Sequence, residues 1–201
     1  MPAANTTKAA DKEQLKPVML WIHGGGFHAG TGSDPNFDGG NMASRGDVVV
    51  VTINYRLGTL GFLALDDGVT NGNYGLADQV TALSWVQAHI RDFGGDPDRI
   101  TIFGQSAGAA SVRALLGSSE AKGKFHAAIM MSNLGGKDYA STFSQYQTIG
   151  EEAANAQAIL NATKCTGNNT LACLRAYDAT DLVLLSAQAK YVRELSNSLK
   201  P

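Results

Sequence analysis

Residues 99–108 constrain the fold of this chain more than any other stretch. Residues 100–103 read Ile-Thr-Ile-Phe and predict a buried strand, and residues 104–108 read Gly-Gln-Ser-Ala-Gly, a G-x-S-x-G pattern. A sharp turn from strand to helix would push the Ser106 hydroxyl out of the backbone, and glycine is needed where neighbouring chains crowd such a turn. The N–H groups that open the next helix point toward negative charge developing nearby. We therefore predict that Ser106 is a nucleophile, although this short pattern alone is a weak signal.

Three other apolar runs predict strands, at residues 18–23, 47–54 and 127–132. They are unbroken rather than alternating, which is typical of strands buried on both faces of a parallel sheet. Residues 24–27 read Gly-Gly-Gly-Phe directly after the first strand, so their amides could face inward without side chains in the way. A plain flexible turn is the alternative for this loop. Residues 28–46 are polar and predict another loop.

Helices are predicted over residues 76–92, 107–116, 143–161 and 170–195. In the first of these, six apolar residues recur at helical spacing: Leu76, Val80, Leu83, Trp85, Val86 and Ile90. Gly94 and Pro97 are expected to end that helix. Strands that alternate with helices predict an α/β fold with a mostly parallel central sheet and flanking helices.

The composition is that of an ordinary globular protein. The chain has 201 residues, 44% hydrophobic and 17% charged, with a formal net charge of −2. This balance gives no electrostatic reason to expect nucleic acid or an anionic membrane as a partner. Residues 1–16 form a polar lead-in without a recognisable signal peptide, and no apolar run reaches membrane-spanning length. Residues 17–201 are expected to form one domain.

The sequence leaves the state of its two cysteines open. Cys165 and Cys173 are separated by seven residues and are compatible either with a small disulfide or with two free thiols. Three N-x-[ST] sequons, at Asn5, Asn161 and Asn168, favour secretion, although some would arise by chance among twelve asparagines.

Several motifs resemble, in the same order, those of type-B carboxylesterases and lipases of the α/β-hydrolase fold, the group that includes cholinesterases. The resemblance covers residues 17 to about 180. The motifs lie at residues 18–27, 54–56, 61–63, 75–79, 85–86, 93–97, 101–108 and 173–175.

The resemblance implies a carboxylic ester hydrolase that works through an acyl-enzyme. Ser106 matches the nucleophile of the family, and Gly25, Gly26 and Ala107 match the positions whose N–H groups form the oxyanion hole. One such donor is typically worth about 3 kcal/mol of barrier. The substrate would be a small-molecule or lipid ester, and neither a cofactor nor a metal is implied. Secretion and a disulfide between the two cysteines are also implied.

Two departures from the family stand out. Gln105 occupies the position before the nucleophile, where the family usually has Glu, so a negative charge beside the site is lost and lower activity is expected. The triad acid and histidine should follow the serine, but only His126 does so. His126 precedes the predicted strand 127–132, on the order of 20 Å from the edge that carries the site, which is beyond the reach of a general base.

His23 and His28 are weaker candidates for a substitute base, and His89 is interpreted as structural. The chain therefore resembles an internal piece of the family that carries the oxyanion loop and the nucleophile turn but neither the triad acid nor its histidine. Its outer strands, at residues 48–53 and 127–131, would then expose apolar edges that favour aggregation. A non-catalytic relative that acts through surface contacts, or an inactive truncated product, is the alternative.

Overall fold

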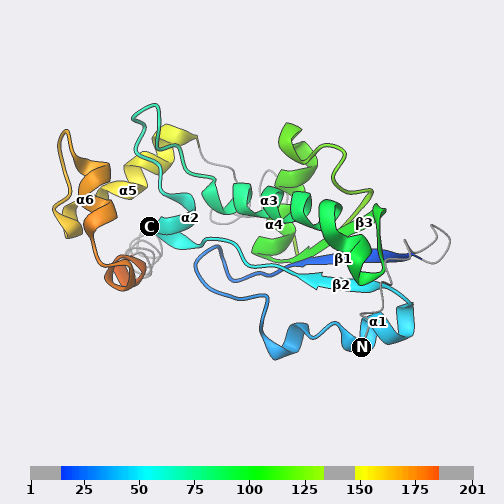
Figure 1. Cartoon of the computed structure of the whole chain (residues 1–201). Helices are drawn as coiled ribbons and strands as arrows, with labels where there is room; N and C mark the ends of the chain where they lie inside the picture. The colour runs from blue at the N-terminus through cyan, green and yellow to red at the C-terminus, as the bar shows by residue number, and fades with distance from the viewer. Residues whose placement is uncertain (1–14, 134–147, 186–201) are drawn as a thin grey trace, which may run out of the picture. The chain divides into compact units, whose positions relative to one another are not determined.

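The computed structural model describes residues 15–133 and 148–185, which divide into two compact units. The sheet unit consists of residues 15–23, 31–53 and 80–133, and the helical unit consists of residues 24–30, 54–79 and 148–185. Nearly all of the predicted polar lead-in lies outside the described residues. Figure 1 shows both units and labels all six α-helices of the described residues and the strands β1, β2 and β3.

The sheet unit is built on four parallel strands in the order β2-β1-β3-β4. The strands are β1 (Lys16–Ile22), β2 (Val49–Thr52), β3 (Gly95–Gln105) and β4 (Ala127–Met131). Parallel neighbours need crossover connections, which the intervening helices supply. The prediction of a mostly parallel sheet with flanking helices is thus confirmed.

The two central strands carry the core. Val18, Leu20 and Ile22 of β1 are fully buried, and they pair in register with Ile100, Ile102 and Gly104 of β3. Alternate side chains point to the other face, because successive residues of a strand alternate. This double burial explains why the sequence shows an unbroken apolar run instead of an alternating pattern.

Aromatic rings pack on that other face. The ring of Trp21 lies 5.0 Å from Phe37 and 4.9 Å from Phe103, measured between centroids. On the outer strand β4, by contrast, Ile129, Met130 and Met131 are each more than a third exposed. As predicted, β2 and β4 are the outer strands of the sheet. An edge strand with exposed apolar side chains, such as β4, favours association with other chains.

Helix α3 (Tyr74–His89) and the 3-10 helix η3 (Ile90–Phe93) correspond to the predicted helix at residues 76–92. Gly94 follows in the left-handed conformation, as expected for a glycine that ends a helix. Trp85, one of the apolar residues that recur at helical spacing, has a side chain that is 50% exposed and packs beside His89. The buried stripe runs through Gln79, Leu83, Val86 and Ile90, and Trp85 lies beside it.

The predicted loop at residues 28–46 is also partly wrong. It contains the 3-10 helix η2 (Pro35–Phe37) and the short helix α1 (Gly40–Gly46). Asp34 caps η2, because its side chain accepts a hydrogen bond from the Asn36 backbone N–H. Sequence periodicity does not reveal such short elements, which local capping defines. The sheet unit also contains α4 (Ala107–Gly117) and the 3-10 helix η4 (Ser119–Ala121).

The helical unit contains α2 (Gly58–Phe62), the first turns of α3, α5 (Ile149–Thr163) and α6 (Thr170–Ala176). The Thr148 and Glu151 side chains form a capping box at the start of α5. The predicted helix at residues 170–195 is interrupted after α6, and a new helical segment at residues 179–185 begins with Asp178 as its cap. The rest of that prediction, and residues 143–147 of the other, lie outside the described residues.

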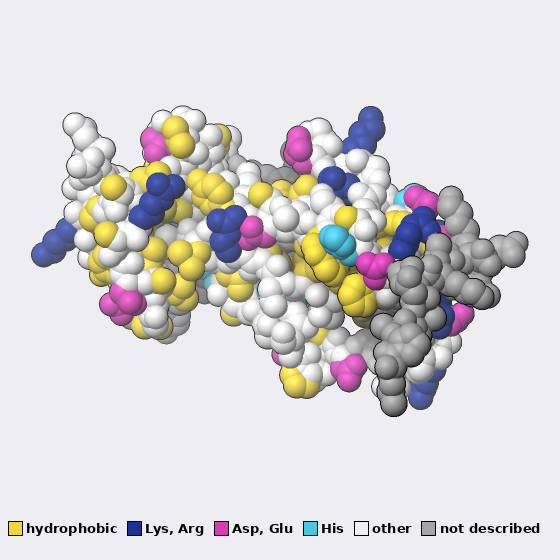
Figure 2. Space-filling view, viewed as in Figure 1, with side chains coloured by type: hydrophobic (Ala, Val, Ile, Leu, Met, Phe, Trp, Pro, Cys, Tyr) yellow, Lys and Arg dark blue, Asp and Glu magenta, His cyan; other side chains and the backbone are white. Residues whose placement is uncertain are grey.

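A small core holds the helical unit together. Its buried members are Ile159, Cys165, Leu174 and Leu182, and partly buried apolar residues pack against them. Elsewhere on the molecule, acidic and basic side chains are interspersed on the face drawn in Figure 2, with hydrophobic side chains between them.

Candidate active site

The turn between β3 and α4 presents Ser106 in a strained backbone conformation. Its φ and ψ angles are 56° and −118°, a region that non-glycine residues rarely occupy and that costs about 1–3 kcal/mol. The residue is exposed, and its side chain makes no capping hydrogen bond to α4. The Ser106 N–H donates to the Met131 carbonyl at 2.9 Å, which places the turn beside the carboxyl end of β4.

Close backbone approach explains the two glycines of the turn. A Cβ atom added to Gly108 would lie 2.0 Å from the Ile22 carbonyl oxygen, and one added to Gly104 would lie 2.5 Å from the Gly108 carbonyl carbon. Real Cβ atoms do not approach other atoms this closely, so only glycine fits at either position. The sharp turn predicted from the G-x-S-x-G pattern is therefore observed.

Gln105 and Ala107 flank the serine. Gln105 is the last residue of β3 and is exposed, whereas Ala107 is buried and is the first residue of α4. The N–H groups at the start of a helix have no partner within the helix and carry a partial positive charge. The Ala107 N–H is one of these groups.

His126 lies at the far end of β4 from Ser106. The His126 N–H donates to the Ile100 carbonyl at 2.8 Å, just before β4 begins, whereas Ser106 lies beside Met131, where β4 ends. The five residues of β4 span on the order of 16 Å at about 3.3 Å per residue. A general base needs hydrogen-bond reach, so His126 does not serve Ser106. His89 is exposed beside Trp85, and His23 is buried at the end of β1.

The glycine-rich loop belongs to the helical unit, and its backbone is unusual. Gly25, Gly26 and Phe27 all have positive φ, at 115°, 62° and 62°. The Gly25 carbonyl accepts hydrogen bonds from the N–H groups of His28 and Ala29, both at 3.1 Å, and a Cβ atom on Gly25 would lie 2.1 Å from the Ala29 carbonyl oxygen. Among the residues that the structure describes, no backbone carbonyl accepts from the N–H of Gly25 or Gly26. The loop is thus a tight turn.

Helix α2 contacts the last residue of this glycine-rich segment, Phe27. The Gly58 N–H donates to the Phe27 carbonyl at 2.7 Å, and the Phe27 ring contacts the ring of Phe62 edge-on at 5.2 Å. These contacts hold Phe27 in place directly after Gly25 and Gly26, the two candidate N–H donors of the loop.

An ion pair that the sequence analysis did not identify joins the chain before α2 to α3. The Arg56 guanidinium pairs with the Asp78 carboxylate and also lies over the Tyr74 ring, 5.5 Å from its centroid. The Arg56 hydrogen bond holds the pKa of Asp78 below its usual value. The sequence held one signal for this ion pair: the motif at residues 54–56 carries a positive charge and the motif at residues 75–79 a negative one.

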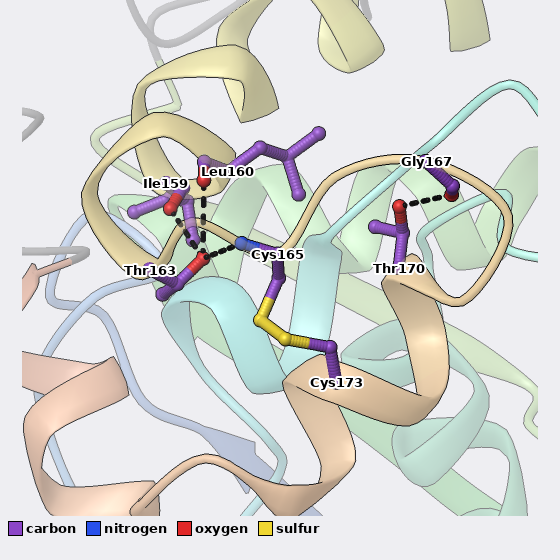
Figure 3. The surroundings of a disulfide bond; sticks show 7 residues. All are labelled: Ile159, Leu160, Thr163, Cys165, Gly167, Thr170 and Cys173. Atoms are coloured by element: carbon purple, nitrogen blue, oxygen red, sulfur yellow. Dashed lines mark hydrogen bonds between the residues drawn. A yellow bond between two sulfur atoms is a disulfide. The ribbon is translucent and has the colours of Figure 1, made fainter.

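A disulfide joins Cys165, which follows α5, to Cys173 in α6 (Figure 3). Cys165 is fully buried in the core of the helical unit. Thr163 donates to the Ile159 carbonyl at 2.8 Å and accepts from the Cys165 N–H at 3.3 Å. Of the two states that the sequence left open, the structure contains the disulfide.

An open hollow of about 390 Å³ lies in the sheet unit and does not include Ser106. It is lined by residues 32–35, 37–40 and 43 together with Val50 and Thr52. No three His, Cys, Asp or Glu side chains within the described ranges are placed to hold a metal ion. No described helix has the length and apolar character needed to cross a membrane.

Comparison with known proteins identifies the family. The model of the carboxylesterase family matches residues 2–200. The para-nitrobenzyl esterase of Bacillus subtilis (strain 168) is 54% identical over 118 residues, which are 58% of this chain and 24% of the relative. Carboxylesterase 5A of Ovis aries is 44% identical over 177 residues, 87% of this chain and 45% of the relative. Neuroligin-2 of Mus musculus is 54% identical over 117 residues, 58% of this chain and 14% of the relative.

The fold agrees with these relatives. The solved structure of a thermophilic PNB esterase superimposes with a TM-score of 0.78 at 42% identity, covering 90% of this chain and 36% of that one. This chain therefore spans less than half the length of the relatives that it matches. With its parallel sheet, its flanking helices and its strained serine turn, the chain belongs to the carboxylesterase family of α/β-hydrolases.

Proposed function

We propose that residues 17–201 are part of the domain of a carboxylic ester hydrolase in which Ser106 is the nucleophile. The Ser106 Oγ would attack the ester carbonyl carbon and give its proton to a general base. The alcohol would then leave, and water would hydrolyse the acyl-enzyme. The single observation that carries this proposal is the strained, exposed conformation of Ser106 at a turn where only glycine fits on either side.

The backbone N–H groups of Gly25, Gly26 and Ala107 would stabilise the tetrahedral oxyanion. Support comes from the positive φ angles of the two glycines and from the place of Ala107 at the start of α4. Fixed donors of this kind act where negative charge develops, and each is worth about 3 kcal/mol.

The general base would come from a segment that these 201 residues do not contain. His126 is too far from Ser106, and it is the only histidine after the serine. The isolated chain should accordingly show negligible turnover of short-chain aryl esters. The disulfide supports secretion, because such bonds persist in oxidising compartments.

A second candidate function is a non-catalytic relative that acts through surface contacts. Two observations favour it. Gln105 stands before the serine, where the family usually has an acidic residue. Neuroligin-2, whose name does not denote an esterase, is as identical to this chain over its matched segment as the para-nitrobenzyl esterase is. The retained serine turn and glycine loop favour the hydrolase instead.

A chimera separates the two candidates. The 118 matching residues of the Bacillus subtilis para-nitrobenzyl esterase would be replaced by those of this chain, so that the relative supplies the remaining machinery. We expect hydrolysis of a para-nitrobenzyl ester that falls on the order of 10⁴-fold or more in the Ser106→Ala variant. Ser118→Ala at the other end of α4 is the control and should keep the rate. A folded chimera without turnover would contradict the hydrolase proposal.

A further inference from the structure

The described residues contain two N-x-[ST] sequons, Asn161-Ala-Thr163 and Asn168-Asn-Thr170. They lie only seven residues apart, on either side of Cys165, yet the structure gives them different surroundings. This contrast allows one of them to be assigned a role and the other to be used as a matched control.

The disulfide points to the compartment in which sequons are modified. Cys165 and Cys173 enclose Asn168 in a short loop, and disulfides form in the secretory pathway but rarely in the cytosol. The transfer of N-linked oligosaccharides takes place on the surfaces of proteins that enter the same pathway. In a eukaryotic host, a chain that forms this bond passes through the compartment that holds the modifying enzyme.

Asn168 is placed for modification. Asn168 and Asn169 are both exposed in the disulfide loop, and Gly167 before them has a φ of 84° with nothing within 4 Å of an added Cβ atom. The Thr170 hydroxyl donates to the Gly167 carbonyl at 2.8 Å, so the sequon threonine lies on the same turn (Figure 3). A bulky sugar on Asn168 would extend away from the buried core of the helical unit.

Asn161 is placed differently. It lies within α5, and its side-chain oxygen accepts a hydrogen bond from Gln157 at 3.0 Å. Its sequon threonine, Thr163, is half-buried and donates to the carbonyls of Ile159 and Leu160 (Figure 3). The hydroxyls of Thr163 and Thr170 both donate to backbone carbonyls. The two sequons therefore differ in their backbone: Asn161 is held by the helical hydrogen bonds of α5, whereas Asn168 lies in a loop.

We propose that Asn168 is a site of N-linked glycosylation and that the exposed disulfide loop accommodates the glycan in the folded chain. The Asn168 Nδ2 forms a bond to C1 of an N-acetylglucosamine that a polyprenyl diphosphate donor carries. The bond between C1 and the diphosphate breaks, the lipid diphosphate leaves, and Nδ2 loses one proton. The host transferase and its lipid-linked oligosaccharide supply everything else, so no redox step is involved. This inference does not depend on ester hydrolysis.

The full chain would be directed into the secretory pathway of yeast with a host leader peptide. Because the glycan is added on entry, both the secreted and the retained pools would be collected. Peptide-N-glycosidase in ¹⁸O-water followed by peptide mass spectrometry converts each glycosylated Asn into labelled Asp and identifies the site.

We expect Asn168 to be glycosylated in most molecules. Asn168→Gln and Thr170→Val should each remove one glycan, whereas Thr170→Ser should keep it because serine supplies the same hydroxyl. Asn161→Gln should leave the glycan at Asn168 unchanged. Molecules that have formed the disulfide but carry no glycan at Asn168, or carry one at Asn161 in its place, would overturn the assignment.

Discussion

Arg56 and Asp78 pair through two parallel hydrogen bonds, from Nε to Oδ2 and from Nη2 to Oδ1, each 2.8 Å long. The same Oδ2 accepts the Arg56 backbone N–H at 2.9 Å. The Arg56 carbonyl lies so close to Gly61 and Gly75 that an added Cβ atom would be 2.1 Å and 2.4 Å from its oxygen. The carboxylate therefore holds the segment from which α2 starts, and α2 in turn holds Phe27 behind the glycine loop.

Asp78→Asn should lower the free energy of unfolding by about 1 kcal/mol at neutral pH, a value that allows for solvent screening of a partly exposed pair. The pKa of Asp78 is lowered in the folded state, first by the Arg56 hydrogen bond. Its stabilisation is therefore complete above the unfolded-state pKa of about 4 and is lost as pH falls through the lowered folded-state value. Urea unfolding at several pH values measures this.

The control for this prediction is Asp98→Asn. Asp98 faces Arg91 at 3.8 Å, and both side chains are well exposed, so its loss should change the free energy of unfolding little. An Asp78→Asn variant with the stability and pH profile of the parent chain would contradict the proposed role of the pair.

Gly108→Ala should destabilise the sheet unit by about 3 kcal/mol, because the new methyl group would overlap the Ile22 carbonyl oxygen. Gly117→Ala at the last residue of the same helix is the matched control. Nothing lies within 4 Å of its added Cβ atom, so the control should be neutral or slightly stabilising. Thermal unfolding of both variants tests this, and equal losses would show that the close approach is not what demands glycine.

Reduction of the disulfide should destabilise the helical unit by roughly 2.5 kcal/mol on the loop-entropy estimate for a separation of eight residues. Urea unfolding with and without reductant measures this, and the double variant Cys165→Ala, Cys173→Ala should show a larger loss because Cys165 is fully buried. The double variant itself should be insensitive to reductant. Identical unfolding midpoints for the oxidised and reduced chain would contradict a stabilising bond.

Long apolar runs and glycine patterns made much of the fold predictable. The four strands, α4 and the turn at Ser106 follow from residues whose burial or backbone conformation leaves few alternatives. The sequence pattern did not predict two helix boundaries that local hydrogen bonds define. Asp34 caps η2 inside an expected loop, and Asp178 starts a new helical segment inside an expected helix.

Two side chains show the same limit. Trp85 fits the apolar pattern of α3 but lies beside the buried stripe. Only the side of a helix that faces the core is buried, so some apolar residues next to that side stay exposed. Arg56 pairs with a residue 22 positions away in the sequence, and such a partner becomes evident only when the fold brings both together. The role of Ser106 remains a prediction that rests on its turn.

Gln105→Glu in the esterase chimera should raise the rate about 5-fold, which corresponds to about 1 kcal/mol. A carboxylate beside the serine would stabilise the imidazolium that forms when the base takes the proton. Ala88→Glu on α3 adds one negative charge at an exposed position elsewhere and should not change the rate. Steady-state kinetics with a para-nitrobenzyl ester measures both, and an equal or lower rate for Gln105→Glu would show that the glutamine does not limit activity.

The most direct test of the account is covalent labelling of Ser106 by a fluorophosphonate, followed by peptide mass spectrometry. This probe phosphonylates a serine hydroxyl that a general base activates, with loss of fluoride. We predict rapid labelling of Ser106 in the chimera, none in its Ser106→Ala variant, and only background labelling of the isolated chain. Labelling of Ser106 in the isolated chain at the rate of the chimera would contradict the claim that its base lies elsewhere, and a chimera that resists the probe would contradict Ser106 as the nucleophile.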